Sequence, residues 1–347
     1  MEREYLERLA HMLEAIQSLE GRLGNDAKSA AAFKRLRSLA REAPAPLKSI
    51  RPSIEWGALE AIGDFGSTQK KHSPDGMLQR VKSAILNEFN LDSGTLVYAE
   101  RTDSSFAAIF DSSLDGRPVR CLYMDGVLSS AEFSGGSPAL LYPPFVMRSF
   151  EMLKNPSHGL VIGVAGGTMM EVLKRAFPAI HVDGVDIDKE IISLGKKFFS
   201  LKEDGRTSLH IADGRKFIRS AGKKYSIIVI DALCGISPVP DMATVEFASE
   251  VKSAMGPGGV CAINIIAKVE RGGYLQFAYD TWRSVFRNVF VLPLCKEGEL
   301  FNVVLIATDA DSKGFGKQNS DAIYPMDFDP SRVFTDHDNR VRELSPY

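Results

Sequence analysis

The sequence has few cysteines and histidines, and neither type is grouped. Its four cysteines (Cys121, Cys234, Cys261 and Cys295) show no CxxC spacing, and its six histidines form no HExxH or paired pattern. Isolated cysteines of this kind are typical of reducing compartments, whereas secreted domains pair theirs. We therefore expect reduced thiols, a cytoplasmic location and no structural metal.

Long apolar runs and a strong net charge are also missing. The chain contains no run of about 18 apolar residues that would span a bilayer, and its charged N-terminus lacks the apolar centre of a signal peptide. A net charge of −2 over 347 residues gives no general attraction to nucleic acid or to an anionic membrane. The 44% hydrophobic content is typical of a globular protein, and the length suggests about two domains.

Residues 1–90 show a helical pattern. One apolar stripe follows helical spacing and comprises Tyr5, Leu9, Met12, Ile16, Leu19 and Leu23. We predict a helical N-terminal extension over this range. We favour a helical cap packed on the chain's own domain, and the stripe is also compatible with a homodimer or a partner-binding hairpin.

Residues 91–135 alternate with a period of two, which predicts a small antiparallel β domain with "LDGR" and "MDG" turns. Over residues 136–310, apolar strand patterns alternate with helical ones, which favours crossover units and a mainly parallel sheet. The predicted strands are 159–163, 180–186, 207–211, 225–231, 259–266, 288–294 and 300–307.

The last two predicted strands are joined only by "CKEGEL". This link is too short for a parallel crossover, so the two strands must pair antiparallel. An α/β sheet of seven strands that ends in such a hairpin is the arrangement of Rossmann-like, class I methyltransferase-like folds. Residues 311–347 are polar, and we expect them to form a loosely packed C-terminal tail.

A glycine-rich turn follows the first of these strands. The stretch "GLVIGVAGGTMMEVLKRAF" places Gly163, Gly166 and Gly167 between an apolar run and a helical pattern. Such a turn begins many nucleotide-binding crossovers. The sequence lacks GxxxxGK[ST], which argues against a nucleotide triphosphatase, and "GVAGG" lacks the second glycine of GxGxxG, which weakens an NAD assignment.

Three further strands end in aspartates. Asp186 ends the second strand in "VDGVDID", Asp213 follows the third in "HIADGRKF", and Asp231 follows the fourth in "YSIIVIDAL". Open α/β sheets bind ligands outside the carboxyl ends of their strands, so these loops should converge. Asp186 can accept ribose hydroxyls and Asp213 an adenine amino group. Alternatively, Asp186 or Asp188, and Asp213, cap the helices that follow.

These motifs, together with "EFASEVKSAMGPGGVCAINI" and "LYMDGVLSSAEF", resemble the spermidine synthase family over residues 94–307, and in particular its methyltransferase-like branches. The resemblance implies that Gly163, Gly166 and Gly167 line the methionine side of an S-adenosyl ligand. It also implies that the remaining cofactor-binding and catalytic positions are Asp186, Ile187, Asp213, Gly214 and Asp231, with Asp231 beside the reacting centre.

The chain departs from the pattern of the aminopropyltransferases in this family. Their loop "GGGDGG" carries an aspartate for the free amine of decarboxylated S-adenosylmethionine, whereas "GVAGG" has no acid. We expect such a neutral turn, with free backbone N–H groups, to accept the carboxylate of S-adenosylmethionine. Cys234 replaces a second aspartate, Ser129 replaces a glutamine, and "GGSPALLYPP" replaces the family's "YHE" stretch.

The leading hypothesis is therefore an S-adenosylmethionine-dependent methyltransferase whose acceptor is an amine, including an amine on a protein. Asp231 either orients and deprotonates that amine or only positions the ligand; Tyr142 and Glu132 are candidates for lining the acceptor pocket. One alternative is a polyamine aminopropyltransferase that uses decarboxylated S-adenosylmethionine. A second is a catalytically silent binding module whose working part is the helical N-terminus.

Overall fold

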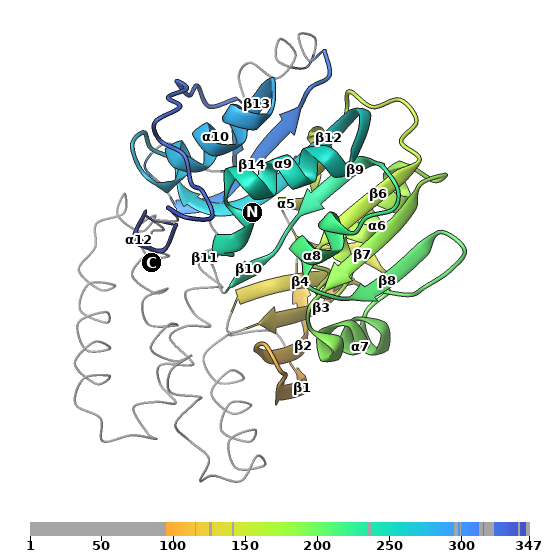
Figure 1. Ribbon diagram of the computed structural model, residues 1–347. Coiled ribbons are helices and arrows are strands. Elements are labelled where there is room, and N and C mark those ends of the chain that lie inside the picture. The colour runs from red at the N-terminus through yellow and green to blue at the C-terminus, as the bar shows by residue number, and fades with distance from the viewer. Residues whose placement is uncertain are drawn as a thin grey trace, which may run out of the picture. The chain divides into compact units, whose positions relative to one another are not determined.

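The computed structural model describes residues 95–114, 116–124, 127–140, 142–234, 237–294, 298, 300–311, 315, 323–338 and 341–344 (Figure 1). The predicted helical extension over residues 1–90 lies outside the described residues. The chain divides into two compact units between Gly135 and Gly136. The domain boundaries expected near residues 90 and 310 remain predictions.

The first unit contains an antiparallel meander of four strands, as the period of two predicts. They are β1 (Thr95–Arg101), β2 (Phe106–Leu114), β3 (Arg117–Met124) and β4 (Val127–Phe133). Each strand pairs antiparallel with the next. Ala99, Ala108 and Phe110 form a small buried cluster, and Asp111 accepts a bidentate ion pair from Arg120 on the neighbouring strand.

The second unit is built on a seven-stranded sheet with the order β13-β14-β12-β9-β6-β7-β8. From one edge to the other, these are Asn288–Pro293, Leu300–Thr308, Met255–Lys268, Tyr225–Ile230, His158–Ile162, His181–Asp186 and Thr207–Ile211. β14 runs antiparallel to both of its neighbours, and the pairs that join β12, β9, β6, β7 and β8 are parallel. The predicted parallel sheet with a terminal antiparallel hairpin is confirmed.

Helices connect these strands. They are α5 (Tyr142–Arg148), α6 (Thr168–Ala176), α7 (Lys189–Phe198), α8 (Gly214–Arg219), α9 (Val245–Ala254), α10 (Tyr274–Val285) and the short α12 (Val341–Leu344). The chain reverses its direction across the sheet after β8, so right-handed crossovers place α6 and α7 on one face and the next three helices on the other. α8, α9 and α10 lie side by side (Figure 1).

Short elements complete the second unit. They are β5 (Ser137–Pro138), the hairpin of β10 (Leu233–Cys234) and β11 (Ser237–Pro238), and the single turn η2 (Pro240–Met242). The hairpin begins two residues after Asp231. It therefore lies directly beyond the carboxyl end of β9.

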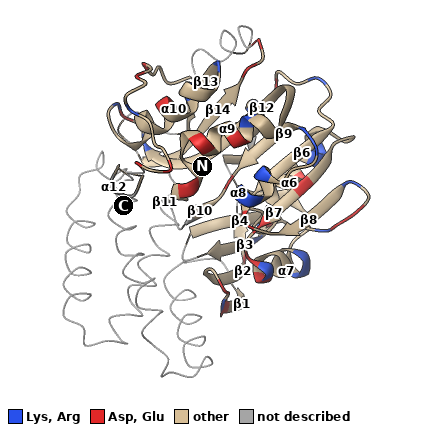
Figure 2. Cartoon of the chain, viewed as in Figure 1, with Lys and Arg blue, Asp and Glu red and all other residues tan. Residues whose placement is uncertain are grey.

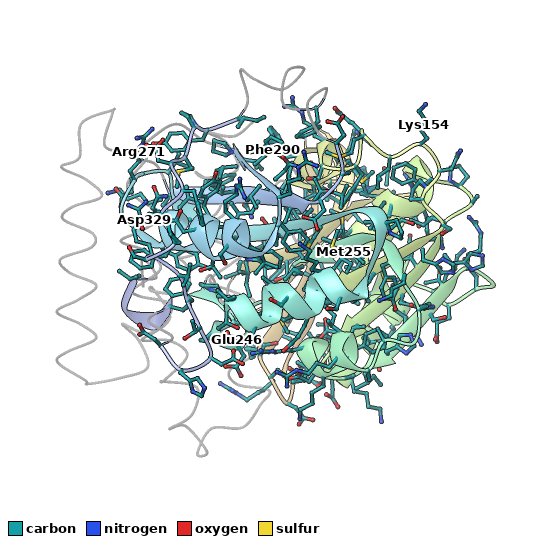
Figure 3. The ribbon with its side chains drawn as sticks, turned by 45° about the horizontal axis from the view of Figure 1, so that its top comes forward. Lys154, Glu246, Met255, Arg271, Phe290 and Asp329 are labelled. Carbon is teal, nitrogen blue, oxygen red and sulfur yellow. The ribbon has the colours of Figure 1, made fainter. Side chains whose placement is uncertain are left out.

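The core lies between the sheet and its helices. β9 is almost entirely buried and apolar, and β12 is buried from Gly259 to Ala267, as is typical of inner strands in an α/β sheet. Phe247 of α9, Trp282 of α10 and Phe286, which follows α10, are buried in this core. Figure 3 shows how densely side chains surround these helices. Acidic and basic residues are interleaved along α7 and α9 (Figure 2), and no helix in the described residues is long and apolar enough to cross a membrane.

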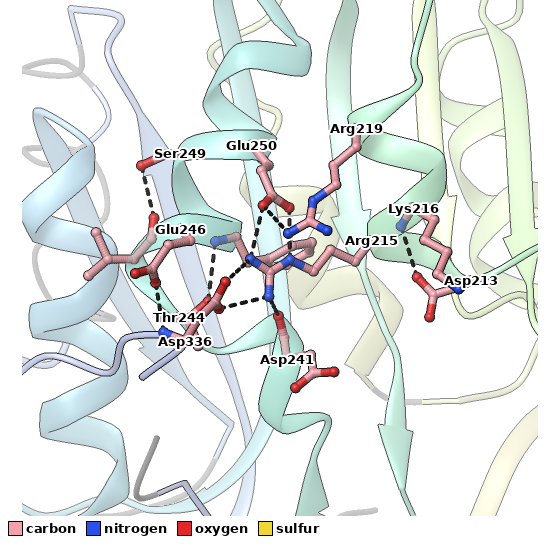
Figure 4. A network of polar contacts seen from close by, with 12 residues as sticks. Asp213, Arg215, Lys216, Arg219, Asp241, Thr244, Glu246, Ser249, Glu250 and Asp336 are labelled. Carbon is pink, nitrogen blue, oxygen red and sulfur yellow. Dashed lines mark hydrogen bonds and ion pairs between the residues drawn. The ribbon is translucent and has the colours of Figure 1, made fainter. Parts of the chain in front are cut away.

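The expected loose packing of the polar tail is wrong for part of it. In the C-terminal segment, defined as residues 323–338, Phe334 is fully buried and stacks on Phe277 at a centroid distance of 5.4 Å. Asp336 binds Arg215 of α8 through two hydrogen bonds of 2.8 Å, while Glu250 of α9 binds the same guanidinium (Figure 4). One apolar anchor and one buried arginine thus hold an otherwise polar segment on the domain.

Candidate functional site

The glycine turn after β6 has a backbone that only glycine accommodates at two positions. Gly163 has φ +88°, and a Cβ there would lie 2.2 Å from the carbonyl oxygen of Asp231. Gly167 has φ +90° and packs against Leu201, whose Cδ1 would lie 2.8 Å from an added Cβ. The carboxyl ends of β6 and β9 therefore approach more closely than any side chain would allow.

Ala165 adopts a left-handed conformation with φ +47°. For a residue with a Cβ this conformation costs roughly 1–2 kcal/mol, so the surroundings must impose it. The side chain of Asp186 supplies the constraint: its Oδ2 accepts hydrogen bonds from the N–H groups of Val164 at 2.9 Å and Ala165 at 3.2 Å. Asp186 thus ties the end of β7 to the turn after β6.

This arrangement corrects the expectation that the turn offers free N–H groups to a ligand carboxylate. Besides the two donors bound to Asp186, Gly163 donates to the carbonyl of Val185 and Gly167 to that of Val164. These N–H groups are already engaged, so they do not favour a carboxylate-bearing cofactor. The turn still contains no acidic residue of its own.

Asp186 keeps room for one more donor. Its Oδ1 accepts one hydrogen bond, from Asp188 N–H at 3.0 Å, and each oxygen of an ionised carboxylate accepts about two. Burial raises the pKa of Asp186, although the hydrogen bonds from Asp188, Val164 and Ala165 oppose the shift. A ribose hydroxyl at Oδ1 would complete its partners, which fits the predicted role.

Two further aspartates at this edge of the sheet cap helices, as the alternative interpretation of the sequence predicted. Asp188 is the N-cap of α7 and accepts from the N–H groups of Glu190 and Ile191. Asp213 is the N-cap of α8, where Oδ1 accepts from Lys216 N–H at 2.8 Å. Because the capping hydrogen bond occupies Oδ1 of Asp213, the predicted contact with adenine would be made by Oδ2. Gly214 is required by packing, since a Cβ there would lie 2.4 Å from Ile162.

Two isoleucines stand exposed at the same edge of the sheet. Ile187 directly follows β7 and is 64% exposed, and Ile211 ends β8 and is 56% exposed. They are two of the three large hydrophobic residues recorded as exposed in the described part of the chain, and β7 and β8 are adjacent. Apolar side chains presented next to Asp186 and Asp213 suit the flat face of an adenine. Ile187 was predicted from the sequence, whereas Ile211 was not.

Asp231 is held at the carboxyl end of β9 by two donors. Its Oδ2 accepts from the hydroxyl of Tyr142 at 2.6 Å, and its Oδ1 accepts from Asn264 Nδ2 at 2.8 Å. Burial raises the pKa of Asp231, and these two hydrogen bonds partly oppose the rise. Both partners are neutral, and neither is an additional carboxylate of the kind that a site for a diamine would need. A half-buried carboxylate with a raised pKa is suited to accept a proton from an amine.

Sequence reasoning missed Asn264 and Asn302, which extend this network. Asn302 Nδ2 donates to Asn264 Oδ1 at 2.9 Å. Each stands as a single polar residue in an apolar strand, "CAINIIA" and "LFNVVLIA", and that isolation is the signal that marks them. Glu132, the other residue considered for the acceptor pocket, lies on β4 directly opposite Arg120 of β3.

Topology brings the predicted positions to one edge. β8, β7, β6 and β9 are consecutive in the sheet and parallel, so Asp213, Asp186, the glycine turn and Asp231 follow their carboxyl ends in that order. Within the described ranges, no group of three or more His, Cys, Asp or Glu residues could hold a metal ion.

The reversed β14, the glycine turn and the aspartates at the carboxyl edge define a Rossmann-like fold of the class I methyltransferase type. Residues 146–295 match the family model described as the spermine/spermidine synthase domain. This match confirms the resemblance to the spermidine synthase family.

Similar proteins include two kinds of enzyme. The polyamine aminopropyltransferase of Vibrio vulnificus is 24% identical over 66% of this chain and 74% of its own length. Putrescine N-methyltransferase 2 of Nicotiana attenuata is 29% identical over 50% of this chain, a match that spans 46% of the plant protein. A solved structure of a probable spermidine synthase from Corynebacterium glutamicum superposes with a TM-score of 0.56 at 17% identity, over 66% of this chain and 96% of that one.

Proposed function

We propose that this protein is an S-adenosylmethionine-dependent N-methyltransferase that acts on an amine, including an amine presented by a protein. The observation that carries the proposal is the Asp231 carboxylate, half-buried at the carboxyl end of β9 and contacted by the neutral donors Tyr142 and Asn264. One carboxylate with neutral partners suits a single amine nitrogen. A dication needs several acids, because an unpaired buried ammonium costs several kcal/mol.

The residues at the sheet edge fit an S-adenosyl group. Ile187 and Ile211 offer apolar surface, and Asp186 Oδ1 can accept one more hydrogen bond. Asp213, the N-cap of α8, accepts the hydrogen bond from Lys216 N–H through Oδ1. When bound, S-adenosylmethionine supplies an electrophilic methyl carbon on its sulfonium. The relatives include putrescine N-methyltransferases, which supports transfer of a methyl group rather than the choice of a single-amine acceptor.

Asp231 performs the proton chemistry in this proposal. The amine lone pair forms the new carbon–nitrogen bond while the carbon–sulfur bond breaks and its electrons pass to sulfur. The nitrogen must lose one proton, and Asp231 accepts it or holds the amine by a hydrogen bond. Tyr142 and Asn264 keep the carboxylate aimed while this happens.

The second candidate is aminopropyl transfer from decarboxylated S-adenosylmethionine. The match to the Vibrio polyamine aminopropyltransferase over 240 residues favours it, as does the engagement of the turn's N–H groups by Asp186. Both reactions displace a sulfonium sulfur at carbon, so Asp231 serves either one.

One experiment separates the two. The protein is incubated with putrescine and each cofactor, and the products are identified by mass spectrometry, while calorimetry measures the binding of each cofactor. N-methylputrescine formed with S-adenosylmethionine, or methylation of a protein amine, supports the proposal. Spermidine formed with the decarboxylated cofactor overturns it in favour of aminopropyl transfer. Asp231→Asn is the control, which should bind cofactor but transfer nothing.

A further inference from the structure

Two asparagines sit inside an apolar sheet without any part in the predicted site. Asn264 on β12 is only 4% exposed and lies in a run of buried residues. A buried amide without partners costs about 1–3 kcal/mol, so its partners indicate why the position is polar. Those partners are Asp231 on one side and Asn302 on the other.

The strand register explains how the three residues meet. β9 and β12 are parallel neighbours in which Ile230 pairs with Ile263, so Asp231 and Asn264 are the next residues along. On the other side, Asn264 pairs with Val304 of the antiparallel β14. Asn302 is two residues from Val304 and therefore projects on the same face, at a diagonal position within reach of Asn264.

The hydrogen bonds permit one orientation of the Asn264 amide. Because Asn302 Nδ2 donates to Asn264 Oδ1, the Nδ2 group of Asn264 must face Asp231. A flipped amide would place its oxygen against the carboxylate and its NH2 against that of Asn302. The contact with the carboxylate would be repulsive, and so would the contact with Asn302 as long as Asn302 presents its NH2 group, so Asp231 and Asn302 together hold the Asn264 amide in this orientation.

Tyr142 completes the constraint from another element. It reaches Asp231 from α5 and donates to Oδ2, while Asn264 donates to Oδ1. Each oxygen thus has its own donor, which opposes rotation of the carboxylate. Among the described residues, Tyr142 is the titratable group in contact with Asp231, and Asn264 is its other side-chain partner.

We infer that Asn264 and Asn302 are positioning residues, which orient the Asp231 carboxylate through a relay of amides that crosses β9, β12 and β14. The inference rests on the proposed function in that Asp231 is the group that meets the acceptor amine. Asn264 acts by direct contact with Asp231. Asn302 acts only by fixing the direction of Asn264.

Asn302→Asp is the decisive variant, because it replaces the donor by an acceptor. The new carboxylate would turn the Asn264 amide, so that Oδ1 faces Asp231 and the pKa of Asp231 rises. We expect kcat to fall at least about tenfold, as for a lost hydrogen bond to a charged group. The acid limb of the pH–rate profile should move up by about one unit, with the KM for cofactor changed less than about twofold.

Two further variants keep the test decisive. Asn302→Leu removes the fixing donor without adding charge, and should lower kcat by a smaller factor if Asn302→Asp fails to fold. Asn288→Asp is the matched control, since Asn288 lies on β13 and donates to the Ala310 carbonyl at 2.9 Å. It should leave kcat and the acid limb unchanged. Circular dichroism and thermal unfolding establish that each variant is folded.

A second measurement separates this inference from the proposed function. NMR of protein with 13C-labelled aspartate carboxyls, assigned with Asp231→Asn, gives the pKa of Asp231 without any turnover. A rise in folded Asn302→Leu, which adds no charge, but not in Asn288→Asp supports the relay, even if no methyl transfer occurs. If the wild type is active and folded Asn302 variants change neither kcat nor the pKa of Asp231, the relay is overturned while the function stands.

Discussion

At the scale of single residues, Asp231 suits the proposed chemistry but its ionised form lowers the stability of the fold. Burial raises its folded-state pKa above the unfolded value. The folded protein therefore disfavours the ionised form, and stability falls as pH rises from the unfolded pKa through the folded one. Above the folded pKa the full penalty of the desolvated charge is present. The presence of Asp231 is therefore explained by its proposed function and not by a contribution to folding.

Asp231→Asn should consequently abolish transfer and stabilise the protein. We expect the free energy of unfolding at pH 7 to rise by about 1 kcal/mol, because the amide removes the charge and the Tyr142 hydroxyl can accept a hydrogen bond as well as donate one. Urea unfolding of both proteins between pH 4 and pH 7 measures the difference, which should shrink as pH falls. A variant less stable than the wild type at pH 7 would contradict this account.

Ile187 illustrates the opposite case, an apolar side chain that the fold itself does not bury. At 64% exposure, its loss should change the free energy of unfolding by less than about 0.5 kcal/mol. Ile187→Ala should nevertheless weaken cofactor binding about tenfold, since an apolar contact with adenine is worth roughly 1.5 kcal/mol. Calorimetry of S-adenosylmethionine measures this. Phe328→Ala, at an exposed position in the C-terminal segment, is the control and should bind normally.

At the scale of elements, the strands of the seven-stranded sheet were predictable to within a few residues. Buried parallel strands read as apolar runs, as in "YSIIVI" of β9, and this signal is local. The antiparallel pairing of β13 and β14 followed from the short link between them. Asp188 and Asp213 lie directly before helices, where caps are expected.

The partners of the site residues were not predictable, because they depend on register between distant segments. The Asp186 side chain contacts N–H groups 21 and 22 residues earlier, and Asn302 meets Asn264 across 38 residues. A sequence shows that these residues are polar in apolar surroundings, but the partner is fixed only when the strands align. The prediction of free N–H groups in the turn was wrong for this reason.

The glycine turn as an element should depend on the Asp186 carboxylate. Asp186→Asn replaces one of the accepting oxygens with an NH2 donor, so either the N–H groups of Val164 and Ala165 or the N–H group of Asp188 would lose their acceptor. We expect a loss of about 1–3 kcal/mol in the free energy of unfolding together with loss of cofactor binding, measured by urea unfolding and calorimetry. Asp188→Asn is the matched control: asparagine caps helices about as well as aspartate, so equal losses in both variants would argue against a special role for Asp186.

At the scale of the whole second unit, composition concealed the packing of the C-terminal segment. Its aspartates and prolines suggest a tail, yet Arg332 pairs with the fully buried Asp280, and Val245 N–H donates to the carbonyl of Phe334. A few anchors suffice because together they engage α8, α9 and α10. Pattern reasoning averages over a window, and it therefore overlooks isolated anchors of this kind.

Phe334 should carry much of the stability that this segment contributes. It is fully buried and stacks on Tyr274 and Phe277 at centroid distances of 6.0 and 5.4 Å. Phe334→Ala should lower the free energy of unfolding by about 3–5 kcal/mol, as for other buried phenylalanines. Phe328→Ala, at a residue that is 42% exposed in the same segment, should cost less than about 0.5 kcal/mol. Urea unfolding compares the two, and similar values would mean that the segment adds little to the domain and that Arg215 and Asp336 merely tether a loose end.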